Sequence, residues 1–294
     1  MRFGFLGTEG PLARATLAAL LEGGAAPDIV IALGLAPVLS HASGPLALAV
    51  AAESSIVSLA KDAGINALHC PSDENAVAAL LLELPWRPQL MVVACLPIIL
   101  RPATFELTEY GFINVHPSLL PAFRGPQPAF WQLQAGCTQG GASVHKMDAG
   151  IDTGTLFLQG KFNLEPGVTE QTLNQRAGNV AGALLASNLV RWPLTPNLVG
   201  GDTPASYQGA PDADAYRIDA RAWSATRAYR FIRGTAWRGV TFEIEGENWL
   251  AHVDQVLEVR ENLRQASPLA DGRTCALPFA DAMLIARGEL RATA

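Results

Sequence analysis

Three side chains that can act together on a carbonyl group stand in two stretches of this chain. Asn114 and His116 lie in the run GFINVHP (111–117), and Asp152 ends the run DAGID (148–152). A side-chain amide donates hydrogen bonds to a developing oxyanion, an imidazole accepts or gives protons near neutral pH, and a carboxylate orients and stabilises the imidazole. This set suits acyl transfer to an amine. The amine would attack directly, so no nucleophilic serine or cysteine is needed.

The pattern around these residues predicts where they meet. Side chains alternate along a strand, so Asn114 and His116 share one face, and Pro117 ends the strand directly after His116. In open parallel sheets, ligands bind at the carboxyl ends of the strands. Residues 143–147 indicate a second strand, and the loop after it would bring Asp152 to the same edge. The glycine in that loop lets the backbone approach a ligand closely.

Short apolar runs alternate with helical patterns through the first half, which predicts an α/β fold with a doubly wound, mostly parallel sheet of Rossmann-like type. The expected strands are 2–6, 29–33, 90–95, 111–116 and 143–147, and the expected helices are 11–22, 51–63, 75–84, 128–135 and 170–191.

The composition and the hydrophobic pattern change in the second half of the chain. Residues 193–211 are rich in Pro, Gly, Asn and Thr and predict a linker. A helix at 224–233 is followed by strand patterns at 240–245, 249–259 and 283–291. We therefore expect a catalytic domain over 1–205 and a smaller β-rich domain over 206–294, similar to an OB-type β-barrel.

Composition narrows the class of protein. The 294 residues are 49% hydrophobic and 16% charged, and the net charge of −6 argues against a nucleic-acid footprint over the whole molecule. The cysteines, Cys70, Cys95, Cys137 and Cys275, are far apart, which indicates reduced thiols in a cytoplasmic protein. Residues 29–52 are uncharged, but Gly and Pro interrupt them, and the first residues are typical of a strand rather than a signal peptide. We expect no membrane association.

Several residues admit more than one interpretation. Gly4, Gly7 and Gly10 do not form the dinucleotide-binding G-x-G-x-x-G pattern. The histidines and aspartates near the site lack metal-ligand spacing, so we expect no metal. Asp148 either caps its loop or takes part in chemistry. The cluster of arginines in the second half is either a solvated helix face or a contact for a phosphate-bearing acceptor; its members are Arg217, Arg221, Arg227, Arg230, Arg233 and Arg238.

The runs NVHPSLLP (114–121), RG (124–125) and VHKMDAGIDTG (144–154) resemble the signature of the 10-formyltetrahydrofolate-dependent formyltransferases. That family includes enzymes that formylate methionyl-tRNA, glycinamide ribonucleotide and sugar nucleotides. Its catalytic Asn, His and Asp match Asn114, His116 and Asp152. Residues 216–246 are also similar to the beginning of the C-terminal barrel of the tRNA-modifying members. The resemblance implies formyl transfer from 10-formyltetrahydrofolate to an amine, without a metal.

The resemblance also implies which residues bind the two substrates. Main-chain groups of two segments would bind the pterin; these residues are Leu96, Pro97, Ile98, Ile99 and Leu100, and Asp148, Ala149, Gly150 and Ile151. Substrate contacts are expected from Gly7, Thr8, Ser118, Leu119, Leu120 and Arg124. His145 is a further candidate that would face either the pocket or the core.

In the expected reaction, Asn114 and a protonated His116 stabilise the oxyanion while Asp152 orients groups and relays protons. Residues 15–60 contain no Lys or Arg, whereas the family's tRNA-modifying members carry a basic loop matching 35–51. We therefore expect a small amine as acceptor, such as an amino-sugar nucleotide or an amino-acid-derived amine, in a monomer or homodimer. The alternatives are methionyl-tRNA formylation, hydrolysis of formyltetrahydrofolate, and a catalytically silent folate-binding protein.

Overall fold

A computed structural model describes residues 1–34, 55–196, 204–261 and 267–293. The neutral segment 35–51 and part of the expected linker lie outside these residues. The chain divides into two compact units. The first comprises Met1–Gly125, Gln139–Phe162 and Gln171–Tyr207, and the second comprises Pro126–Thr138, Asn163–Glu170 and Gln208–Ala294. The expected domain boundary at residues 205 and 206 remains a prediction.

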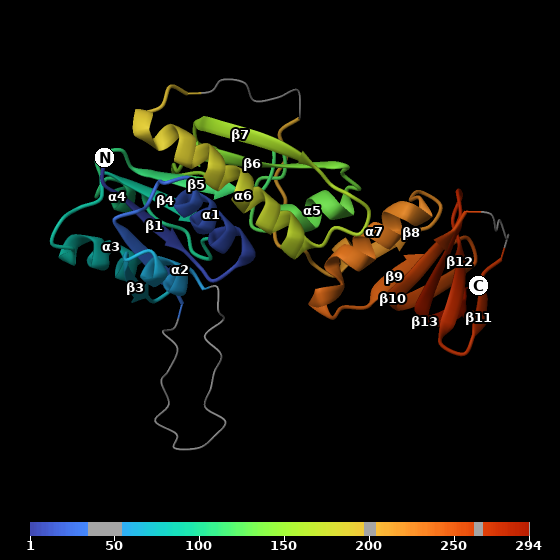
Figure 1. Cartoon of the computed structure of the whole chain (residues 1–294). Coiled ribbons are helices and arrows are strands. Elements are labelled where there is room, and N and C mark those ends of the chain that lie inside the picture. Colours follow the sequence, from blue (N-terminus) through green and yellow to red (C-terminus); the bar gives the residue numbers. More distant parts are fainter. Residues whose placement is uncertain (35–54, 197–203, 262–266, 294) are drawn as a thin grey trace, which may run out of the picture. The chain divides into compact units, whose positions relative to one another are not determined.

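The first unit is built on a seven-stranded sheet in the order β3-β2-β1-β4-β5-β6-β7 (Figure 1). Its strands are β1 (Phe3–Gly7), β2 (Ile29–Leu33), β3 (Asn66–Cys70), β4 (Leu90–Ala94), β5 (Phe112–His116), β6 (Gln139–Lys146) and β7 (Leu156–Asn163). The pairings among β1 to β5 are parallel, and β6 pairs with β5 in the antiparallel direction. The expected mostly parallel α/β fold is thereby confirmed.

Helices cover both faces of this sheet, because its central strands are apolar on both sides. On one face, Leu17 and Leu185 pack in the same core as Val92. On the other face, Val77 and Phe105 pack in the same core as Met91 and Val93. The first face carries α1 (Pro11–Glu22), α2 (Ile56–Asp62) and α6 (Glu170–Asn188), and the second carries α3 (Glu74–Glu83) and α4 (Pro102–Phe105).

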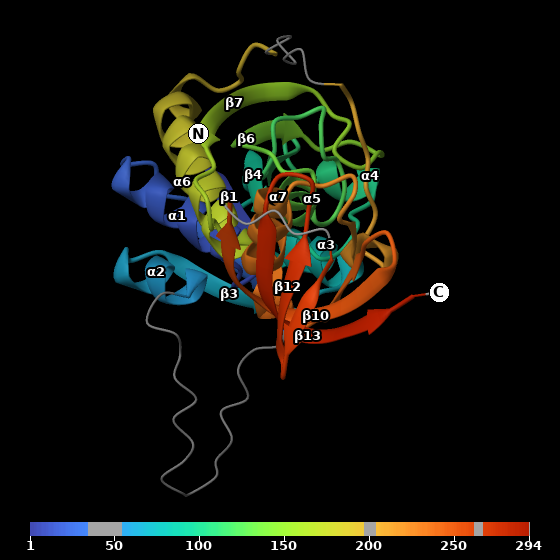
Figure 2. The ribbon, with the colours of Figure 1, turned by 90° about the vertical axis from the view of Figure 1, so that its right-hand side faces the viewer.

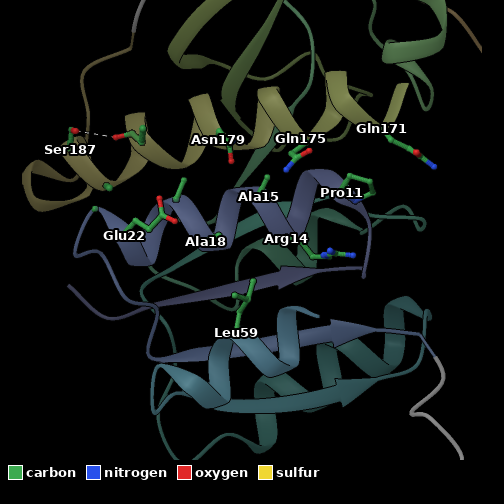
Figure 3. A pocket seen from close by; sticks show the side chains of 14 residues that line it. Pro11, Arg14, Ala15, Ala18, Glu22, Leu59, Gln171, Gln175, Asn179 and Ser187 are labelled. Carbon is green, nitrogen blue, oxygen red and sulfur yellow. Dashed lines mark hydrogen bonds between the residues drawn. The ribbon is translucent and has the colours of Figure 1, made fainter. Parts of the chain in front are cut away.

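Helices α1 and α6 lie against each other through small residues. A Cβ atom built on Gly178 would come within 2.5 Å of the Leu12 carbonyl oxygen, and one on Gly182 within 2.6 Å of the Thr16 carbonyl oxygen. Beside this contact runs a groove of about 1050 Å³, with Asn179 and Gln175 on one wall (Figure 3). Its lining comes from α1 and the following Gly23, from α6 and from Leu59, and includes none of the residues expected to do chemistry.

The second unit contains a six-stranded sheet in the order β11-β12-β13-β10-β9-β8, and Figure 2 shows β10, β12 and β13 together. Its strands are β8 (Arg217–Asp219), β9 (Phe242–Glu245), β10 (Trp249–Arg260), β11 (Leu269–Asp271), β12 (Thr274–Pro278) and β13 (Met283–Ala292). The expected small β-rich unit is present. Within the described residues β8 and β11 are the two open edges of the sheet, so it does not close into a barrel.

Helix α5 (Pro128–Gln134) belongs to the second unit although it lies early in the chain. Its Phe130 makes edge-to-face contacts with Tyr216 and Phe231, and Phe231 contacts Phe242 in the same way. Phe231 lies on α7 (Ala225–Thr235), so this aromatic cluster joins α5 to α7 and the sheet. Aromatic pairs of this geometry add to the stabilisation from buried area.

In the described part of the chain, no helix combines the length and the apolar character needed to cross a bilayer.

Candidate active site

Strand β5 presents two polar side chains on one face. Phe112, Asn114 and His116 alternate with Ile113 and Val115, which pack under α1 and α6. Phe112 packs on the opposite face with α3 and α4. Asn114 and His116 therefore lie on that second face, and His116 is the last residue of the strand. The expected placement at the carboxyl end of a sheet strand is what the structure has.

Asp152 reaches this pair from the loop between β6 and β7. Its Oδ1 lies 3.5 Å from His116 Nδ1 and 3.4 Å from Asn114 Nδ2. Its Oδ2 accepts the backbone N–H of Gly125 at 2.9 Å. Asp152 has a φ of 54°, a left-handed conformation that short polar residues tolerate better than others. Amide, imidazole and carboxylate thus meet at one point.

His145 is a fourth polar residue at this point. It lies directly opposite Asn114 in the β5–β6 register. Its Nδ1 is 2.9 Å from the Lys146 carbonyl oxygen, so Nδ1 carries a proton. In the neutral ring, Nε2 then accepts from Asn114 Nδ2, 3.2 Å away. The His145 ring is buried, as is that of His116, and its expected contact with substrate remains a prediction.

The environment of His116 determines its tautomer and charge. Its Nε2 lies 2.8 Å from the Phe123 carbonyl oxygen, which can only accept, so Nε2 carries a proton. Burial lowers the pKa of His116 below its ordinary value, outweighing the opposite effects of Asp152 and the Phe123 carbonyl. The resting imidazole is therefore neutral, with Nδ1 free to accept a proton. The expected role of a protonated His116 during the reaction remains a prediction.

Asp152 remains ionised. Burial raises the pKa of its carboxyl, but the contacts with His145, His116 and the Gly125 N–H together have a larger, opposite effect, and the pKa falls to about 2. The site therefore holds a fixed anion beside a neutral base. That anion would stabilise a proton arriving on His116 Nδ1.

The loop after β5 is held by buried polar contacts. Ser143 Oγ donates to the Ser118 carbonyl at 2.7 Å and accepts from the Leu120 N–H at 3.0 Å. Ser118 Oγ donates to the Ala122 carbonyl. Ser118 and Leu120 are buried, so their side chains shape the loop in this structure. Leu119 packs over Gly141 of β6. Their expected contact with substrate remains a prediction.

The backbone of Arg124 is held by a hydrogen bond, whereas its side chain has a donor without a partner among the described residues. Its N–H donates to the Ser206 carbonyl at 3.0 Å, while Ser206 Oγ accepts the Phe123 N–H at 2.8 Å. Arg124 Nε is buried and has no hydrogen-bond partner among the described residues. A guanidinium with an unused donor is suited to an anionic ligand.

The first strand-to-helix turn and the segment after β4 lie together. Gly7 pairs with Ala94, and Thr8 Oγ1 donates to the Cys95 carbonyl at 3.1 Å. In the following segment, Ile99 is 76% exposed, whereas Leu100 is buried. Leu96 and Ile98 pack against the core on the α3 face. Pro97 is exposed.

The loop 148–151 is shaped by its first residue. Asp148 Oδ1 accepts the Gly150 N–H at 2.9 Å and the Thr153 hydroxyl at 2.8 Å, which is the geometry of a loop cap. Ala149 and Gly150 are exposed. Ile151 is 43% exposed, an unusual position for a large apolar side chain.

Two backbone groups of the site were not predicted from the sequence. The Phe123 carbonyl sets the tautomer of His116, and the Gly125 N–H holds Asp152. Phe123 has a φ of 58° and Gly125 a φ of 112°. In the sequence, only Gly125 of the RG pair indicated an unusual backbone conformation at these positions. Within the described ranges no group of three or more His, Cys, Asp or Glu residues could hold a metal ion.

The fold and the site define an α/β protein whose candidate chemistry lies at the end of a central sheet strand. The family model described as formyl transferase matches residues 27–189, more than half of the chain. A methionyl-tRNA formyltransferase of Verminephrobacter eiseniae is 32% identical over 213 residues, covering 71% of this chain and 62% of that protein. One of Dehalococcoides mccartyi strain CBDB1 is 34% identical over 164 residues, covering 55% and 52%. The chain belongs to the formyl transferase family.

The chain spans about half the length of the Dehalococcoides mccartyi relative. Among solved structures, it is similar to an N-formyltransferase from Helicobacter canadensis crystallised with folinic acid and dTDP-3-aminofucose. The TM-score is 0.65 at 14% identity, over 98% of this chain and 100% of that one. It is also similar to HypX from Aquifex aeolicus in complex with tetrahydrofolic acid, with a TM-score of 0.56 at 13% identity, over 97% of this chain and 43% of that one. At such identities these likenesses show the fold.

Proposed function

We propose that this protein transfers the formyl group of 10-formyltetrahydrofolate to the amino group of a small-molecule acceptor. One observation carries the proposal. Asn114, His116 and Asp152 come from separate segments, and the Asp152 carboxylate lies within 3.5 Å of polar nitrogens of both others. An amide donor, a neutral base and a fixed anion are the groups that acyl transfer to an amine needs.

The reaction follows from the charge states. The neutral amine attacks the formyl carbon, a C–N bond forms, and the carbonyl oxygen becomes an oxyanion. Asn114 Nδ2–H stabilises this oxyanion in place of its 3.4 Å contact with Asp152. The proton released by the amine goes to His116 Nδ1, where the Asp152 carboxylate stabilises the imidazolium. The bond from the formyl carbon to N10 then breaks. N10 takes a proton, which restores neutral His116 and releases tetrahydrofolate.

The folate is proposed to bind at the two loops that carry unburied apolar side chains. Ile99 and Ile151 are both large, exposed and located in the segments that the family resemblance assigns to the pterin. Covering them with a flat ring would remove apolar surface from water, which is favourable. Backbone groups of the same segments would provide the hydrogen bonds that fix the ring's orientation.

A small acceptor is favoured by charge. The chain carries a net charge of −6, and Arg14 and Lys61 enclose a stretch without any Lys or Arg. Binding to tRNA depends on neutralising phosphates with such side chains. Arg124, with its unused Nε donor, would contact an anionic group of a small acceptor, such as the phosphate of an amino-sugar nucleotide or the carboxylate of an amino acid.

Methionyl-tRNA is the second candidate acceptor, because the curated relatives named above are methionyl-tRNA formyltransferases. The salt dependence of binding distinguishes the two candidate acceptors. Binding through several phosphates weakens steeply between low and moderate salt, whereas binding of a small amine changes little. Saturable transfer to charged initiator tRNA that is lost on raising the salt would replace the small-molecule proposal.

The test is a transfer assay with 10-formyltetrahydrofolate, a panel of dTDP- and UDP-amino sugars, amino-acid-derived amines and charged initiator tRNA. Tetrahydrofolate release and the N-formylated product are both measured. Formylation of a small amine supports the proposal. Folate release without any formylated product would indicate hydrolysis, and folate binding without turnover would indicate a silent binding protein; both results would contradict the proposal.

A further inference from the structure

The carboxylate of Asp152 accepts one short hydrogen bond, and its other polar contacts are longer. Gly125 N–H donates to Oδ2 at 2.9 Å. The polar atoms of Asn114, His116 and His145 all lie 3.4 or 3.5 Å from Oδ1. The Gly125 amide therefore fixes the position of this carboxylate more tightly than the other three contacts do.

Gly125 is followed by a stretch with little conformational freedom. The sequence Gly125-Pro126-Gln127-Pro128 leads directly into α5. Each proline fixes its own φ, and each restricts the residue before it. The backbone between Gly125 and α5 therefore has fewer accessible conformations than an ordinary linker of the same length.

The beginning of α5 is held from outside the helix. Gln127 is the N-cap residue, and its side chain makes no capping hydrogen bond. Its Oε1 accepts a hydrogen bond from Arg238 Nη2 at 2.8 Å. Both residues belong to the second unit, whereas Gly125 is the last residue of its segment in the first.

Arg238 is itself firmly placed. Its Nη2 and Nε donate to Glu170, whose side chain is 3% exposed. Its guanidinium lies 5.0 Å from the ring centres of both Phe130 and Trp237. A cation paired with a buried carboxylate and placed over two rings has few alternative positions.

We infer that Arg238 is a positioning residue for the Asp152 carboxylate, acting through Gln127 and the Pro-Gln-Pro stretch on the Gly125 amide. Its effect on rate rests on the proposed formyl transfer. Its effect on the Gly125–Asp152 hydrogen bond does not.

The informative variant is Gln127→Ala. Removing Arg238 would leave the buried Glu170 carboxylate without its cationic partner and destabilise the protein for an unrelated reason. Gln127 is exposed and loses only its bond to Arg238. The matched control is Gln134→Ala at the other end of α5, where Gln134 Nε2 donates to the Ala215 carbonyl at 3.3 Å.

Two readouts are measured in the full-length protein. The first is kcat and KM for formyl transfer. Gln127→Ala is expected to lower kcat about tenfold with little change in the KM for the folate, because a small misplacement of a catalytic group is costly. The second is the amide resonance of Gly125 in nitrogen-15 spectra. It is expected to move toward its position in Asp152→Asn, while Gln134→Ala leaves both readouts at wild-type values.

Wild-type kcat together with an unmoved Gly125 resonance in Gln127→Ala would overturn the inference. Equal changes in Gln134→Ala would also overturn it, since the effect would then be a general loosening of α5. If the wild-type protein transfers no formyl group, the proposed function fails, and the Gly125 resonance alone decides the inference.

Discussion

Asn114 and His145 face each other across β5 and β6, with Asn114 Nδ2 3.2 Å from His145 Nε2. Because His145 Nδ1 is bonded to the Lys146 carbonyl, its Nε2 is the acceptor that sets the direction of the Asn114 amide. The group proposed to stabilise the oxyanion is thus itself oriented by a buried histidine.

This relationship predicts that His145→Ala lowers kcat about ten- to a hundredfold, because the Asn114 amide loses its orientation. The KM for the folate should change much less. Steady-state kinetics check this. The control is His69→Ala, since His69 is exposed on the edge strand β3 and should be neutral. Equal effects of both substitutions would contradict the orienting role.

The pH dependence of kcat/KM should show an acid limb set by His116. The base must be neutral, and burial holds the pKa of His116 below 6.5, so activity is complete above that pH and falls as the pH drops through the lowered value. The groups that influence this ring are Asp152, His145 and the Phe123 carbonyl.

In Asp152→Asn the anion that raises the pKa of His116 is removed. The acid limb should therefore move to lower pH, together with a large fall in the maximum rate. A pH–rate profile of both proteins checks this. A shift of the His116 limb to higher pH in the variant would contradict the assignment.

The packing of α1 on α6 predicts a stability effect. Gly178→Ala introduces a better helix former, yet its Cβ would lie 2.5 Å from the Leu12 carbonyl oxygen. We expect a net loss of roughly 1–3 kcal/mol in the free energy of unfolding, because overpacking exceeds the gain in propensity. Urea denaturation measures it. Gly209→Ala, which meets no atom within 4 Å, should leave stability near the wild-type value.

The strands at the centre of the first sheet were predictable because they are apolar on both faces. The predicted strand at 29–33 and helix at 11–22 coincide with β2 and α1. The edge strand β3 was missed because its residues are partly exposed and include His69. Strand β7 was also missed, since Gly160 and Lys161 interrupt its apolar pattern.

The side chains proposed for catalysis could be chosen from residue type and spacing. The contacts that position these side chains could not be predicted in this way. The direction of β6 relative to β5, which places His145 opposite Asn114, depends on tertiary pairing. The membership of α5 in the second unit depends on contacts between Phe130 and aromatic residues far along the chain. Such contacts leave no periodic signal in the sequence around α5.

The central claim is that Asn114, His116 and Asp152 act together in formyl transfer. The most direct test is single-turnover transfer from 10-formyltetrahydrofolate to the best amine acceptor, comparing the wild type with His116→Ala and Asp152→Asn, with thermal unfolding measured in parallel. We predict that the transfer rate falls by about 10²–10⁴-fold in both variants. Both variants should also have unfolding temperatures well above the assay temperature, so that they are fully folded in the assay. Wild-type rates in either folded variant would contradict the account.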